Sequence, residues 1–157
     1  MKQAIAEVIA TSFYAGYVPK APGTAGALVG VGAVYLLHHF AYFTTLHLLG
    51  LVVLALLPSI WATNVLIDEL QLKDPQCVVV DEVLGQMLSF LWCDLNNPLS
   101  YLVAFGLFRA FDIWKPFPVN LFEKLPRGIG VIADDLMAGF YAALGIYILH
   151  NFLNLPL

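Results

Sequence analysis

Two pairs of adjacent acidic residues stand at the edges of long apolar stretches in this chain. Asp134 and Asp135 come just before one apolar run, and Asp81 and Glu82 lie in the first turns of another. Carboxylates beside such segments are costly unless they are solvated or bind something. Mg²⁺ takes oxygen ligands of this kind, usually together with water and a substrate phosphate. The pairs together predict a divalent cation site, whereas each pair alone could simply cap a helix N-terminus.

Basic residues near the same segments are suited to phosphate oxygens. Arg109 and Asp112 are three residues apart and therefore share a helical face, and Lys115 follows them. Lys20 precedes Thr24, which we expect to cap the first apolar helix and to offer the free N–H groups there to a phosphate. The alternatives are an interfacial lysine at position 20 and an ordinary ion pair between Arg109 and Asp112.

These residues predict metal-dependent chemistry on a phosphorylated molecule at a membrane face. A bound metal could polarise a phosphoryl group and activate water. The expected metal ligands, direct or through water, are Asp81, Glu82, Asp134 and Asp135. The expected substrate-binding residues are Lys20, Thr24, Arg109 and Lys115. Asp112 completes the catalytic set, either beside the metal ligands or by orienting Arg109, and one carboxylate serves as general base or nucleophile.

The composition is that of an integral membrane protein. Hydrophobic residues make up 61% of the 157 residues and charged residues 11%, against about 45–50% and about 25% in soluble domains. The formal net charge of −4 argues against a nucleic-acid partner, which would need a basic face. The length suits one domain, residues 1–157.

The hydrophobic pattern predicts an all-α bundle of about five apolar segments after a short amphipathic helix at residues 3–16. The segments span residues 25–43, 46–67, 78–92, 99–113 and 136–155. The third and fourth are shorter than the usual membrane-spanning length and could form a hairpin that does not fully cross. The chain is therefore expected to be a multi-pass protein of the lipid bilayer.

Charge is distributed unevenly over the two sides of this predicted bundle. If the segments alternate in direction, all seven basic residues lie on one side or at segment ends that face it, and every acidic residue except Asp94 does too. Because positively charged loops stay in the cytoplasm, we expect the acidic cluster to face the cytoplasm.

Four motifs occur in order along most of the chain. They are PGTAG at residues 22–26, DEVLG at 81–85, FRAFDIWKPFP at 108–118 and GIGVIADDLMAG at 128–139. In these motifs the chain resembles the phosphatidylglycerophosphatase A family. The resemblance implies a Mg²⁺-dependent phosphatase of the bacterial inner membrane. Such an enzyme removes the terminal phosphate of phosphatidylglycerophosphate to give phosphatidylglycerol.

Three other functions are compatible with an acid-rich membrane face. One is a phosphatase for another lipid phosphate. A second is a CDP-alcohol-type phosphotransferase, but its Asp-Gly…Ala-Arg…Gly…Asp…Asp run does not occur in this sequence. The third is a small cation channel or transporter, which would need ionisable residues at mid-membrane, where the segments have almost none. The sequence leaves the oligomeric state open.

Overall fold

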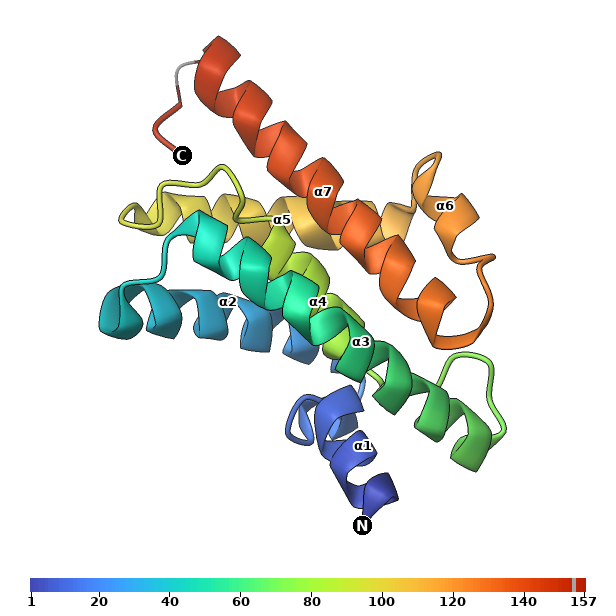
Figure 1. Ribbon diagram of the computed structural model, residues 1–157. Coiled ribbons are helices and arrows are strands. Elements are labelled where there is room, and N and C mark those ends of the chain that lie inside the picture. Colours follow the sequence, from blue (N-terminus) through green and yellow to red (C-terminus); the bar gives the residue numbers. More distant parts are fainter. Residues whose placement is uncertain (154) are drawn as a thin grey trace.

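The computed structural model describes residues 1–153 and 155–157 (Figure 1), and within them every regular element is helical, as predicted. The helices in chain order are α1 Lys2–Ala10, α2 Pro22–Ala41, α3 Thr45–Leu70, α4 Val80–Leu88, α5 Pro98–Trp114, α6 Val119–Phe122 and α7 Arg127–Leu153. A single 3-10 turn, Ala15–Tyr17, lies between α1 and α2. Three long helices, α2, α3 and α7, make up most of the bundle.

Within the described residues, three helices, rather than about five, are long and apolar enough to cross a membrane. They are α2, α3 and α7. The third predicted segment folds as α4, which has nine residues, and the fourth as α5, which has 17. Both are below the about 20 residues that a spanning helix needs. Short turns that follow α4 carry the chain on to Pro98.

The N-terminal helix is shorter than predicted. α1 ends at Ala10, because the Thr11 hydroxyl donates to the Glu7 carbonyl and accepts from the Tyr14 N–H. Such side-chain bonds compete with the helical ones. The next residues turn in left-handed conformations, and the side chain of Phe13, within the predicted helix, is exposed. The predicted amphipathic face is therefore not confirmed.

The start of α2 also differs from the prediction. Pro22 occupies the first helical position and Ala21 the cap, so Thr24 lies within the first turn. Proline suits this position because its fixed φ is helical and its missing N–H would have had no helical partner. The prediction that Thr24 caps the helix is therefore wrong.

Helix α7 begins well before the acidic pair. Its first residue is Arg127, and the Asn64 side chain accepts from the Gly128 N–H at 3.0 Å. Asp134 and Asp135 consequently lie about two turns inside the helix. A carboxylate at that depth cannot cap the helix, so the capping alternative for this pair is wrong, as is the predicted start at residue 136.

The short helix α4 is enclosed by longer helices and packs chiefly against α7 and α2 (Figure 1). A Cβ atom at Gly139 of α7 would lie 2.1 Å from the Gly85 carbonyl oxygen of α4, and one at Gly85 would lie 2.5 Å from the Asp135 carbonyl oxygen. Because neither residue has a side chain, the two backbones can touch. This contact places the acidic pairs of α4 and α7 next to each other.

Different segments of the chain meet at the two ends of the bundle. At one end the His38 side chain contacts Asn96 at 3.3 Å, and Asn97 donates to the Pro156 carbonyl. The turns after α2 and before α5 therefore meet the C-terminal tail there. The starts of α2, α4 and α7 and the end of α5 gather at the other end. This grouping agrees with alternating segment directions.

Candidate active site

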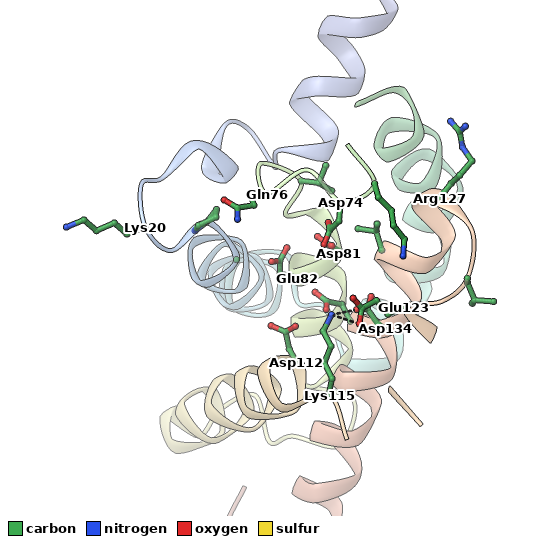
Figure 2. A pocket seen from close by; sticks show the side chains of 17 residues that line it. Lys20, Asp74, Gln76, Asp81, Glu82, Asp112, Lys115, Glu123, Arg127 and Asp134 are labelled. Carbon is green, nitrogen blue, oxygen red and sulfur yellow. Dashed lines mark hydrogen bonds and ion pairs between the residues drawn. The ribbon is translucent and has the colours of Figure 1, made fainter. Parts of the chain in front are cut away.

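A cavity of about 340 Å³ opens where α2, α4 and α7 begin and α5 ends (Figure 2). Its charged and polar lining combines seven of the nine predicted residues with others from two loops. The acidic residues are Asp74, Asp81, Glu82, Asp112, Glu123, Asp134 and Asp135, and the basic ones are Lys20, Lys73, Lys115 and Arg127. Carboxylates from three helices and two loops thus face one space.

Three of these carboxylates form a close group. Asp81, Glu82 and Asp135 each offer an oxygen atom, and these atoms lie within 4.8 Å of one another. Asp81 is 7% exposed and Asp135 4%. One buried oxygen of each residue, Asp81 Oδ1, Glu82 Oε2 and Asp135 Oδ2, has no hydrogen-bond partner among the described residues. Buried polar atoms are nearly always partnered, so these oxygens are free to bind a ligand.

The pKa values of Asp81 and Glu82, the acidic pair of α4, reflect this crowding of carboxylates. Burial raises the pKa of Asp81 well above its ordinary value, and the negative charges of Glu82 and Asp135 raise it further. Burial likewise raises the pKa of Glu82, with the charge of Asp112 adding to it, although Asp81 and Arg109 act in the opposite direction. Ionising this group without a nearby cation is therefore unfavourable. A bound divalent cation would supply the missing positive charge.

Asp134 lies outside this group and is paired differently. Its Oδ2 atom accepts from Lys115 Nζ at 2.7 Å, and Glu123 lies 3.6 Å from the same ammonium group (Figure 2). Burial lowers the pKa of Lys115, but the hydrogen bond and charge of Asp134 outweigh it and raise the pKa above its ordinary value. Lys115 therefore stays protonated. Asp134 Oδ1 is buried and has no partner in the described part of the chain.

A second ion pair near the group joins Arg109 and Asp112, both on α5. Arg109 donates to Asp112, as their spacing predicted, and both side chains are largely buried. A Cβ atom at Gly23 would lie 2.3 Å from Glu82 Oε1 and 3.3 Å from an Arg109 nitrogen. The start of α2 therefore touches both a predicted metal ligand and a predicted phosphate-binding residue.

Comparison with known proteins identifies the family. A family model described as phosphatidylglycerophosphatase A matches residues 8–150. The chain belongs to the phosphatidylglycerophosphatase A family. The resemblance inferred from the four motifs is confirmed, and the protein is a lipid phosphatase.

Three curated bacterial proteins illustrate the range of names in this family. A Bacteroides thetaiotaomicron protein with the provisional name phosphatidylinositol-3-phosphatase is 41% identical over 86% of this chain and 87% of its own length. Phosphatidylglycerophosphatase A of Haemophilus influenzae is 31% identical over 89% and 85% of the two chains. The Escherichia coli protein of the same name is 28% identical over 87% and 78%. No solved structure matches the chain.

Three predicted substrate-binding residues lie differently from expectation. Thr24 and Arg109 are not among the residues that line the cavity. Lys20 lines its mouth, but its exposed side chain points away from the carboxylates (Figure 2). Arg109 and Lys115 instead pair with two other predicted carboxylates, Asp112 and Asp134 respectively.

Sequence reasoning missed several lining residues, namely Lys73, Asp74, Gln76, Glu123 and Arg127. They lie in the loop before α4 and around the start of α7. Their charges are visible in the sequence, but nothing in their spacing links them to the acidic pairs. Arg127 is also held by Asp68, at 2.7 Å, and its side chain points away from the carboxylates (Figure 2).

We expect Gly23→Ala to lower phosphatase activity about tenfold without destabilising the fold. The added methyl group would displace the Glu82 carboxylate, which can move because it ends a flexible side chain. Displacements of about 1 Å in an active site can cost up to about 100-fold in rate. The measurement is kcat/KM beside the melting temperature. Gly50→Ala in α3, where a Cβ meets no atom within 4 Å, is the matched control, and equal activity of the two variants would contradict the prediction.

Proposed function

We propose that this protein hydrolyses the terminal phosphate monoester of phosphatidylglycerophosphate to phosphatidylglycerol, using Mg²⁺. The observation that carries the proposal is the buried group of Asp81, Glu82 and Asp135 with its unpartnered oxygens. We place the enzyme in the bacterial inner membrane. The uneven distribution of basic residues supports an orientation in which the cavity faces the cytoplasm.

The donor set fits a magnesium ion. Carboxylate oxygens are its preferred protein ligands, and it usually keeps waters and binds substrate phosphate in the remaining positions. Asp81, Glu82 and Asp135 would hold the ion, and Asp134 could join them through water. When bound, Mg²⁺ would supply Lewis-acid polarisation of the phosphoryl group. The free oxygens of these three carboxylates accept no hydrogen bond from any described residue, at a helix N-terminus or elsewhere.

The remaining residues of the site bind phosphate and move the proton. Arg109 donates to the phosphate oxygens, as does Lys115, whose ammonium has three donors and can keep Asp134 as a partner. The free Asp134 Oδ1 accepts a proton from the attacking water. The water oxygen bonds to phosphorus while the bond from phosphorus to the glycerol oxygen breaks. That oxygen takes a proton from solvent water while Asp134 returns its proton to solvent, and the products are phosphatidylglycerol and inorganic phosphate.

Hydrolysis of phosphatidylinositol 3-phosphate is the second candidate, because the Bacteroides relative named for it is 41% identical. The two substrates share the same arrangement of functional groups. Each carries a phosphate monoester on a polyol that a phosphodiester links to diacylglycerol. Lys73 at the cavity wall offers a cation for the diester in either lipid. The polyol is what distinguishes them.

Phosphate release from four substrates tests the proposal. The purified protein should release phosphate from phosphatidylglycerophosphate faster than from phosphatidylinositol 3-phosphate, phosphatidic acid or glycerol phosphate. A chelator should abolish release, and Mg²⁺ should restore it. Faster release from the inositol lipid would favour the second candidate. Full activity in the presence of chelator would refute the magnesium assignment.

A further inference from the structure

A second cavity lies between α2 and α5, away from the acidic group. It measures about 360 Å³ and is lined by Val31, Gly32, Tyr35, His39, Leu95, Asn96, Pro98 and Tyr101. The Tyr35 and Tyr101 rings meet edge to face at 5.9 Å, and the Tyr101 hydroxyl is held by the Leu95 carbonyl at 2.9 Å. The walls are therefore largely apolar and aromatic.

The same two helices line both cavities. α2 contributes Gly23 to the acidic cavity and Gly32 to the apolar one, and α5 contributes Asp112 and Tyr101 respectively. Gly23 and Gly32 are nine residues apart, which corresponds to about 14 Å along a helix. This helix pair therefore forms a path from the acidic cavity to the apolar one.

We propose that the apolar cavity binds an acyl chain of the phospholipid substrate. The inference rests on the proposed function, because it needs the lipid headgroup in the acidic cavity. One leaflet of a bilayer contributes about half of the roughly 30 Å hydrocarbon core, so the end of a long acyl chain reaches the depth of Gly32. Gly32 lies near the middle of α2, one of the helices that can span a membrane, and is the end of the cavity nearest the acidic group; from there the cavity continues toward His39 and Asn96 at the opposite end of the bundle.

Gly32 allows the cavity to be filled without disturbing the protein. A Cβ atom there would meet no atom within 4 Å, so Gly32→Leu places a side chain in the space that we assign to the acyl chain. Gly106→Leu in α5 and Gly50→Leu in α3 are matched controls. Both positions are equally open and neither lines the cavity.

The experiment compares long-chain (palmitoyl) and short-chain (hexanoyl) phosphatidylglycerophosphate in the same detergent micelles. Gly32→Leu should raise KM for the long-chain lipid roughly tenfold, equivalent to the loss of about two buried methylene groups. KM for the short-chain lipid should stay unchanged, which also shows that the variant is folded. Gly32→Val should give a smaller effect in the same direction, and the two controls should give none.

Two results would overturn the inference. An equal change in KM for both lipids would assign the cavity to another occupant, such as a second copy of the chain. No change for either lipid would show that it does not contact the substrate. If the wild-type protein hydrolyses neither lipid, the proposed function fails instead, so the two failures are distinguishable.

Discussion

Glu82→Gln should reduce phosphate release by about 100- to 1,000-fold while leaving the protein folded. The substitution keeps the size of the side chain but removes one charged ligand from the group with Asp81 and Asp135. Metal polarisation of a phosphoryl group contributes several kcal/mol, and each 1.36 kcal/mol corresponds to a factor of ten in rate. The measurement is kcat/KM on phosphatidylglycerophosphate at saturating Mg²⁺.

The same variant should be more stable than the wild type when no metal is present. Because the pKa of Glu82 is raised in the folded state, this residue lowers the stability as pH rises from its ordinary pKa toward the raised value. A neutral glutamine removes that loss. Thermal unfolding at neutral pH with chelator measures the difference. Glu69→Gln, on an exposed residue outside the cavity, is the control and should change neither stability nor activity.

An ordinary rate for Glu82→Gln would contradict the assignment of this residue. So would a loss of activity that merely follows a loss of stability, because the role would then be structural. The prediction thus requires activity and metal-free stability to change in opposite directions.

Gly139→Ala should destabilise the protein by about 3 kcal/mol, the upper range for overpacking a buried site. The new methyl group would lie 2.1 Å from the Gly85 carbonyl oxygen. Backbone atoms cannot swing aside as a flexible side chain can, so α4 and α7 must separate. That separation moves Asp81 and Glu82 away from Asp135, and activity should fall with stability. Unfolding in detergent and phosphate release measure the two effects.

Gly145→Ala is the matched control in the same helix. A Cβ atom there would make its nearest contact, with Leu107, at 3.4 Å, an ordinary packing distance. Replacing glycine by alanine in a helix normally stabilises by about 0.5–1 kcal/mol. We therefore expect this variant to be at least as stable as the wild type. Equal stability of the two variants would mean that the α4–α7 contact is looser than described.

Much of the acidic cluster could be predicted from the sequence. Charges are rare in this chain, so those next to apolar segments stand out, and alternating helix directions bring them to one end. The pairing of Arg109 with Asp112 follows from helical spacing alone. The family motifs indicated the lipid phosphatase activity, which the charge pattern alone left general, and the magnesium ion stays a prediction.

The rest depended on tertiary packing. The spacing of Asp134 and Asp135 cannot show that α7 begins at Arg127, because Asn64 of another helix supports that start. The sequence also offers no basis for assigning different roles to Asp134 and Asp135. In the structure Asp135 joins Asp81 and Glu82, whereas Asp134 pairs with Lys115. The sequence likewise predicted a longer apolar segment, 78–92, in place of α4. The contacts that enclose α4, such as that of Gly85 with Gly139, are made with residues distant in the chain, so the local pattern does not reveal them.

Calorimetric titration of the metal-free protein with Mg²⁺ tests the central claim most directly, with Asp135→Asn as the comparison. The wild type should bind the ion saturably, and the variant, whose side chain is nearly the same size, should lose that binding while remaining folded. Binding that is equal in the two proteins, or absent from the wild type, would contradict a magnesium site formed by Asp81, Glu82 and Asp135.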